Sequence, residues 1–249
     1  SKAPYGRHTW LYRSTTGLSD GNYTDINAAP VTPRFINISD SLPLSTYYNS
    51  SSPPNISGIA ISPTDHLKVW ISVSGYQKGF RVFKTIDGGN TWENADPDTT
   101  LPQHPANNIV VQEGTNDRLF LATNVGVYYT EAGMNGWEKV SDFPNCQVME
   151  LRINTCSNKL FAATYGRGAW SIDLPESTGY DHEREITTNT TYTEDAFLER
   201  NLRVKSGSKL TIKGILYMPS RGKIIVEAGA TLEVDGGTIK NNCGTFWDG

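Results

Sequence analysis

The chain has 249 residues, a mass of 27.5 kDa and a formal charge of -4, from 22 Lys and Arg against 26 Asp and Glu. Neither sign of charge forms a long block, which argues against a nucleic-acid partner, because such affinity comes from clustered cations. No stretch approaches the roughly 20 consecutive apolar residues that a membrane-spanning helix needs. The sequence opens on SKAPYGRH, without a signal peptide, so we expect a processed or internal piece of a longer chain.

Short β-branched and aromatic runs, separated by Gly, Asn, Asp and Pro, recur along most of the chain, which is the pattern of an all-β protein. We predict the third and fourth strands of an early unit within residues 9–27, followed by a Ser/Pro/Asn-rich connection from 30 to 54. Residues 55–95 predict four successive strands, and the pattern repeats over 107–140 and, with three strands, over 147–174. Repeats of about 40 to 50 residues are typical of propeller blades.

We assign residues 1–174 to the C-terminal blades of a β-propeller and 175–190 to a linker, because the pattern changes there. VKSGSKLTIKG and VEAGATLEVDG then align with an offset of 22 residues, so residues 191–249 predict the first coils of a β-solenoid. Each coil should repeat inward apolar side chains (Leu210 and Ile212, then Leu232 and Val234) and a corner glycine (Gly207, then Gly229). The predicted fold class is all-β, a partial propeller followed by the start of a parallel solenoid.

One turn between two predicted strands carries the pattern Thr85-x-Asp87-x-Gly89-x-Thr91-Trp92. An Asp side chain accepts hydrogen bonds from backbone N–H groups a few residues on, and Gly tolerates the positive φ angles of a tight turn. Each residue of the pattern is therefore expected to help form the turn. We therefore predict that these five residues close a hairpin and are not catalytic.

The cysteines and histidines show no metal-binding pattern. Cys146 and Cys156 would pair only if the chain between them bent back, so their state stays open. No C-x-x-C or H-E-x-x-H spacing occurs, and the four histidines are scattered singly. The alternation Asn94, Asp96, Asp98 lacks the Gly that a calcium loop needs. We predict no metal and no cofactor.

The turn pattern resembles the Asp-box, or BNR, repeat of the propellers found in sialidases, xyloglucanases and sortilin-type receptors. Degenerate copies begin at Arg13 and Tyr129. ATYGRGAWSIDL is similar to the last-blade sequence of secreted bacterial members, and the solenoid segment resembles the one that follows such propellers in cargo of the bacterial type IX secretion system. The resemblance implies a secreted or cell-surface location and passage through the secretion apparatus.

Glu150, Arg152, Tyr165 and Arg167 are the candidate ligand-binding residues, since Arg offers a planar fork to a carboxylate and Glu150 and Arg152 share a strand face. The alternative is an ion pair between blades and an Arg that fixes a turn. A sialidase would also need an Arg in an R-I-P context on an early blade, which is absent here.

We therefore expect a non-catalytic scaffold, adhesion or glycan-binding module whose partner is an extracellular glycan or a surface protein. Exposed aromatic residues are candidates for stacking on sugars, namely Tyr47, Tyr48, Tyr76 and Trp137. The alternative is the C-terminal remnant of a glycoside hydrolase, sialidase-like or xyloglucanase-like, whose catalytic blades precede residue 1.

Overall fold

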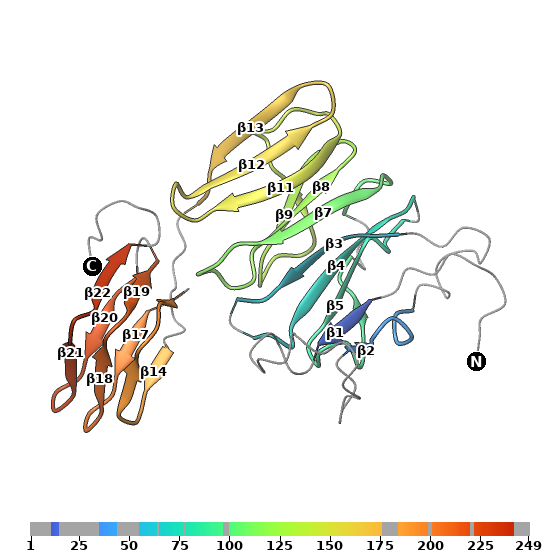
Figure 1. Cartoon of the computed structure of the whole chain (residues 1–249). Helices are drawn as coiled ribbons and strands as arrows, with labels where there is room; N and C mark the ends of the chain where they lie inside the picture. The colour runs from blue at the N-terminus through green and yellow to red at the C-terminus, as the bar shows by residue number, and fades with distance from the viewer. Residues whose placement is uncertain are drawn as a thin grey trace, which may run out of the picture. The chain divides into compact units, whose positions relative to one another are not determined.

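The computed structural model describes residues 11–14, 35–43, 55–63, 65–76, 78–96, 100–175, 184–198, 201–219 and 222–241. Within these ranges every regular element is a β-strand, so the chain is all-β as predicted (Figure 1). Contacts divide the chain into two compact units: one holds residues 1–111, 119–151 and 163–168, and the other holds 112–118, 152–162 and 169–249. The division runs through the third antiparallel sheet.

Three antiparallel meanders follow one another in the chain. The first consists of β3 (Asn55–Ile61), β4 (Val69–Ser74), β5 (Val82–Thr85) and β6 (Glu93–Asn94). The second consists of β7 (Ala106–Val111), β8 (Leu119–Thr123), β9 (Gly126–Thr130) and β10 (Glu138–Lys139). The third has three strands, β11 (Val148–Asn154), β12 (Lys159–Thr164) and β13 (Gly168–Asp173). In each sheet the strands pair in chain order.

The early unit differs from the prediction. Strand β1 (Tyr12–Ser14) pairs antiparallel with β2 (Phe35–Asn37), which lies in the range predicted as a connection. The fourth strand predicted within residues 9–27, after the strand that is now β1, lies outside the described residues. A three-residue strand among Pro, Asn and Ser offers too short an alternation to be recognised, although Phe35 stands where Trp92 and Trp137 stand in the later units.

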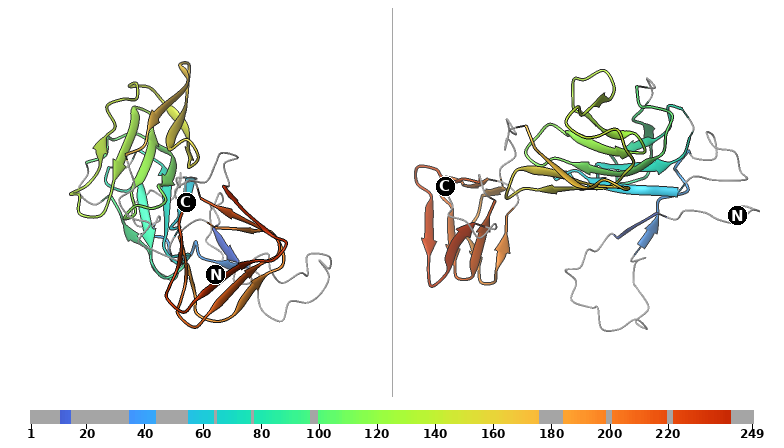
Figure 2. Two further views of the ribbon diagram at one scale, coloured as in Figure 1. Left: turned by 90° about the vertical axis from the view of Figure 1, so that its left-hand side faces the viewer. Right: turned by 90° about the horizontal axis from the view of Figure 1, so that it is seen from above.

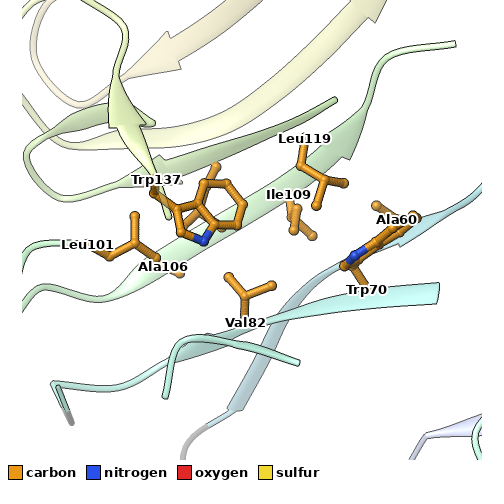
Figure 3. Packing of buried hydrophobic residues seen from close by; sticks show 9 residues of the cluster. Ala60, Trp70, Val82, Leu101, Ala106, Ile109, Leu119 and Trp137 are labelled. Carbon is orange, nitrogen blue, oxygen red and sulfur yellow. The ribbon is translucent and has the colours of Figure 1, made fainter. Parts of the chain in front are cut away.

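The first two meanders share a hydrophobic core. Figure 3 shows Trp70 and Val82 of the first sheet facing Ile109 and Leu119 of the second, with Trp137 beside them. Trp137 is only 5% exposed, so the prediction that it is an exposed residue for sugar stacking is wrong. Burying a large apolar side chain contributes about 1.5–3 kcal/mol, and this core therefore fixes the two sheets against each other.

The first strands of the meanders lie side by side, with their starts at the same edge. Ser57 Oγ of β3 donates a hydrogen bond to the carbonyl of Ala106 in β7, at 2.7 Å. Asn107 Nδ2 of β7 repeats this bond to the carbonyl of Val148 in β11, also at 2.7 Å. Successive meanders packed through their innermost strands are the blades of a β-propeller, and the chain holds part of one.

The second unit contains three stacked coils of a parallel β-solenoid. The first coil consists of β14 (Arg184–Ile186), β15 (Thr190–Tyr192) and β16 (Ala196–Phe197); the second of β17 (Leu202–Val204), β18 (Lys209–Ile212) and β19 (Ile215–Met218). The third consists of β20 (Ile224–Val226), β21 (Thr231–Val234) and β22 (Thr238–Asn241). Corresponding strands pair in parallel, so that each coil contributes one strand to each of three sheets (Figure 2).

The coils stack in the predicted register, in which Leu210 pairs with Leu232 and Ile212 with Val234. Gly207 and Gly229 adopt positive φ angles of 80° and 81° at equivalent corners. Leu210 and Ile212 are buried, whereas Val234 in the third coil is 47% exposed, because coil stacking covers it from one side only.

The first coil begins at Arg184, inside the range predicted as a linker. Its strands are short and polar, so the alternation that marks the later coils is weak here. Side chains at its corners compensate by accepting backbone hydrogen bonds from the next coil: Asn189 Oδ1 from Lys209 N at 2.9 Å, and Asp195 Oδ1 from Ile215 N at 3.0 Å. These acceptors align the two coils.

The two cysteines whose pairing was left open are not bonded to each other. Cys156 is disulfide-bonded, while Cys146 is a free thiol. Cys243 lies outside the described residues. In the described part of the chain no helix has the length and apolarity needed to cross a membrane.

Candidate functional site

The turn between β5 and β6 is built around the carboxylate of Asp87. Its Oδ1 accepts hydrogen bonds from the Thr85 hydroxyl at 2.8 Å and from the Thr91 backbone N–H at 2.9 Å. Its Oδ2 accepts one from the Thr91 hydroxyl at 2.6 Å. The Thr85 hydroxyl also accepts the backbone N–H of Gly89 at 2.9 Å. Both carboxylate oxygens are thus used in closing the turn, which leaves Asp87 poorly suited to act on a substrate.

Two glycines let neighbouring chain segments approach this turn closely. Gly88 and Gly89 have φ angles of 69° and 94°, which disfavour other residues. A Cβ atom at Gly89 would lie 2.7 Å from the Cβ of Ile38, so a side chain there would clash with the early unit. The carbonyl of Gly88 accepts a hydrogen bond from Arg13 Nη1 at 2.6 Å. The turn therefore anchors the β1–β2 pair to the first meander.

The tryptophan that ends the turn bonds to the preceding unit, and the next meander repeats this contact. Trp92 Nε1 donates to the carbonyl of Ile38 at 3.3 Å, and Trp137 Nε1 donates to the carbonyl of Ala95 at 3.2 Å. Ile38 and Ala95 each follow the fourth strand of the unit before. The sequence analysis assigned Trp92 only to closing its own hairpin, because the acceptor of its bond is a backbone atom that no sequence pattern marks.

We predict that Asp87→Asn weakens the turn in a pH-dependent way. Hydrogen bonds from Thr91, first from its hydroxyl and then from its N–H, together with Thr85, lower the pKa of Asp87 from 3.8 to about 2. A carboxylate with a lowered pKa stabilises the fold above its unfolded pKa and loses that contribution as pH falls through the folded value. The wild type should thus lose stability between pH 3.8 and about 2, measured by urea unfolding. An equal loss in Asp87→Asn would contradict this role.

A buried ion pair that sequence analysis missed lies between the first two meanders. Arg81 Nη1 and Asp96 Oδ2 are 3.5 Å apart, and both side chains are fully buried. Arg81 Nε also donates to the carbonyl of His104 at 2.7 Å. Burial raises the pKa of Asp96 from 3.8 to about 6 despite the opposing charge of Arg81. Arg81 and Asp96 thereby tie the start of β5 to the connection that leads into β7.

Two of the three residues of the alternation Asn94, Asp96 and Asp98 form hydrogen bonds or ion pairs within the fold. Asn94 Oδ1 accepts the backbone N–H of Asp96 at 2.9 Å, and Asn94 Nδ2 donates to the carbonyl of Gly79 at 2.7 Å. Asn94 and Asp96 are therefore engaged in the fold, and Asp98 lies outside the described residues. No group of three or more His, Cys, Asp or Glu in the described ranges is arranged to hold a metal ion.

The four predicted ligand-binding residues occupy two places in the third sheet. Glu150 and Arg152 are exposed on β11, and Arg152 belongs to the second compact unit. Tyr165 and Arg167 are exposed in the turn between β12 and β13. The Tyr165 N–H donates to the carbonyl of Gln147 at 2.8 Å, which fixes this turn beside the start of β11. Tyr165 and Arg167 thus share one turn, while Arg152 lies towards the other end of its strand.

The turns that follow the second strand of each meander form what we call the turn edge of the first unit (residues 75–76, 78–79, 124–125 and 165–167). They lie at one edge because the first strands start there and the second strands run antiparallel to them. Tyr165 and Tyr76 of this edge are 74% and 64% exposed. The Asp87 turn joins the third and fourth strands and therefore lies at the opposite edge.

No protein-family model and no curated protein match the sequence. Solved structures similar to this chain include YCF48 bound to D1 peptide, at 19% identity and a TM-score of 0.38, over 51% of this chain and 38% of that one. An ancestral GH74 enzyme is similar at 15% identity and a TM-score of 0.36, over 52% and 18% of the two chains. The GH74 xyloglucanase from Xanthomonas campestris is similar at 15% identity and 0.37, over 48% and 22%. The chain thus spans 38% or less of each of these structures.

Proposed function

We propose that this chain is a non-catalytic, glycan-binding part of an exported Asp-box propeller protein, and that it binds its glycan at the turn edge. The observation that carries the proposal is the exposure of Tyr76 and Tyr165 on tight turns of a rigid sheet scaffold. Tyrosine combines an apolar ring face with a polar hydroxyl and loses little conformational entropy on binding. These properties suit the apolar faces and hydroxyl groups of a sugar.

Arg167 favours a glycan that carries carboxylates. It lies two residues after Tyr165 in the same exposed turn. A guanidinium binds a carboxylate through two parallel hydrogen bonds, which adds orientation to affinity. We therefore propose an acidic glycan at this turn, with Glu150 of β11 as a neighbouring contact; Arg152 belongs to the other compact unit and is not part of the proposed site.

Export is supported by the cysteine chemistry. Cys156 is disulfide-bonded, and structural disulfides are formed and kept in oxidising compartments outside the cytosol. The secreted or cell-surface location and the passage through a type IX apparatus rest on this bond together with the sequence resemblance. The glycoside hydrolase alternative gains no support from Asp87 and Asp96, since Asp87 is used in its turn and Asp96 is buried against Arg81.

A glycan microarray tests the proposal. The wild-type chain should bind acidic glycans, and Tyr165→Ala and Arg167→Ala should each weaken binding about tenfold, which corresponds to about 1.4 kcal/mol. Phe35→Ala is the matched control, because Phe35 is 60% exposed at the start of β2, a fourth strand, and so at the opposite edge. Binding only to another protein, or no binding to any glycan, would overturn the glycan proposal. Glycan binding that survives both turn variants would overturn the assignment to the turn edge.

A further inference from the structure

A lysine of the second meander places its ammonium group at the turn edge. Lys139 of β10 pairs with Tyr128 of β9, and the pairing continues through the Val140 N–H, which donates to the carbonyl of Val127 at 2.9 Å. A Cβ atom added to Gly126 would lie 3.2 Å from Cε and 3.7 Å from Nζ of Lys139. The side chain of Lys139 therefore lies across the turn between β8 and β9, at the edge where the second strands end.

The segment that leads into β11 holds this ammonium group in place. Lys139 Nζ donates a hydrogen bond to Asn145 Oδ1. Asn145 belongs to residues 144–147, which the buried side chains of Phe143 and Val148 anchor at both ends. A short segment fixed at both ends loses little freedom when a ligand binds, so the position of the Lys139 ammonium group is set in advance.

The same segment also contacts the turn that carries the proposed glycan site. The carbonyl of Gln147 accepts the N–H of Tyr165 at 2.8 Å. Residues 144–147 thus bind Lys139 through Asn145 and the Tyr165 turn through Gln147. Lys139 and Tyr165 therefore line neighbouring parts of one edge, and all of these residues belong to the first compact unit.

The positive charge of Lys139 is not balanced by an acidic side chain. Lys84 of the first meander pairs with Glu93 at 3.0 Å, whereas the partner of Lys139 is a neutral amide. In the described part of the chain no carboxylate lies within ion-pair distance of Lys139. An anionic ligand group can approach this cation without first displacing an acidic partner. The chain as a whole carries a charge of -4, so attraction of an anion has to come from local cations of this kind.

We infer that the ligand of the turn edge is a linear glycan of uronic acid residues, and that Lys139 binds the carboxylate of one sugar while Arg167 binds that of another. This inference rests on the proposed function, which places an acidic glycan at the Tyr165 turn. A uronic acid chain repeats a ring face and a carboxylate at every residue, so one chain can stack on Tyr165 and meet both cations. A glycan with a single acidic sugar at its end would use Arg167 alone.

The two cations have different tasks in this arrangement. The planar guanidinium of Arg167 fixes the orientation of the carboxylate that it binds. The ammonium group of Lys139 is a compact point charge that accepts a carboxylate from several directions. It therefore suits the second contact, where the flexible links between sugars leave the carboxylate less precisely placed. Lys139 sets the preference for a chain over a single acidic sugar.

Isothermal titration calorimetry with galacturonic acid and its oligomers of two to six residues tests the inference on the full wild-type chain. The hexamer should bind at least about tenfold more tightly than the monomer, because the second contact forms within the same complex. Maltohexaose, a neutral oligomer of the same length, should bind at least about tenfold more weakly than the galacturonate hexamer. Equal affinities for the monomer and every oligomer would overturn the second contact.

Lys139→Gln should lower the affinity for the galacturonate hexamer about tenfold and leave that for the monomer within about twofold. Lys84→Gln is the matched control, because it removes the same charge next to the Asp87 turn, where Lys84 pairs with Glu93. Its affinity for the hexamer should stay within about twofold of the wild type. Equal losses in the two variants would show that net charge sets the affinity, and the assignment to Lys139 would be wrong.

Failure of this inference and failure of the proposed function give different results. If Tyr165→Ala and Arg167→Ala weaken hexamer binding but Lys139→Gln does not, the contact with Lys139 is wrong and the turn site stands. If hexamer binding survives all three changes, both assignments are wrong. If no galacturonate binds the wild type, the uronic acid chain is wrong, and the glycan microarray decides the proposed function separately.

Discussion

Asp96→Ala is expected to destabilise the first unit by about 3–5 kcal/mol, because Arg81 would remain buried without its carboxylate. Arg81→Met should cost a similar amount, since it leaves the buried Asp96 unpaired and removes the bond to the His104 carbonyl. The combined variant Arg81→Met with Asp96→Leu should lose less than the sum, because no buried charge is left alone. Urea unfolding followed by circular dichroism measures all three.

Glu93→Ala is the control, because Glu93 pairs with Lys84 at 3.0 Å at the surface of the same sheet. Removing an exposed pair should change stability by less than about 1 kcal/mol. Equal losses in Glu93→Ala and Asp96→Ala would show that burial does not set the strength of the Arg81–Asp96 pair. Strict additivity in the double variant would show that the two side chains act independently.

The contribution of Asp96 to stability changes with pH in the direction opposite to that of Asp87. The folded pKa of Asp96 is raised to about 6 from 3.8, so the folded chain binds the proton more tightly than the unfolded chain. Stability from this group therefore increases as pH falls from about 6 to 3.8, and it is lost above the folded value. The gain is up to roughly 3 kcal/mol. Asp96→Asn should remove this rise. A wild-type free energy of unfolding that decreases, relative to that of Asp96→Asn, as the pH falls from about 6 to 3.8 would contradict the prediction.

Trp137→Ala is expected to cost about 3–5 kcal/mol, because it empties a site in the core shared by the first two meanders. It also removes the bond from Nε1 to the Ala95 carbonyl. Trp137→Phe should cost less, since most of the apolar contact remains and the lost hydrogen bond is worth about 1 kcal/mol. Chemical unfolding of both variants gives the comparison.

Tyr76→Ala is the matched control for Trp137, as an aromatic residue exposed on the turn edge. Its stability should stay within about 0.5 kcal/mol of the wild type. If Trp137→Ala unfolds at the wild-type urea concentration but loses glycan binding, Trp137 is a binding residue after all.

Much of the fold follows from the sequence because strand alternation and turn residues are local signals. The meanders after Asn55 and the stacked register of Leu210 on Leu232 were predicted in this way. Strand β2 and strand β14 at the start of the first coil were missed, because each has too few apolar residues to show a period of two. In the first coil, the side chain of Asn189 accepts a backbone hydrogen bond from Lys209 of the next coil. Hydrogen bonding there takes the place of the apolar alternation that marks the later coils.

The candidate site was less predictable because it depends on which side chains are covered by distant segments. Trp137 and Tyr76 look alike in the sequence, but Trp137 packs into the core and Tyr76 stays exposed. No sequence pattern links Arg81 to Asp96, and only the fold places the two side chains together. The free state of Cys146 likewise depends on where the chain brings Cys156, which no local pattern fixes.

The most direct measurement compares Tyr165→Ala and Asp87→Asn in one pair of assays, binding to the acidic glycan selected from the array and unfolding in urea. Tyr165→Ala should weaken binding about tenfold at unchanged stability, because its side chain is exposed. Asp87→Asn should lower stability and leave the binding of the folded protein unchanged, because its carboxylate closes a turn at the opposite edge. Loss of binding in a fully folded Asp87→Asn, with Tyr165→Ala unaffected, would contradict both the structural role of the turn and the binding role of the turn edge.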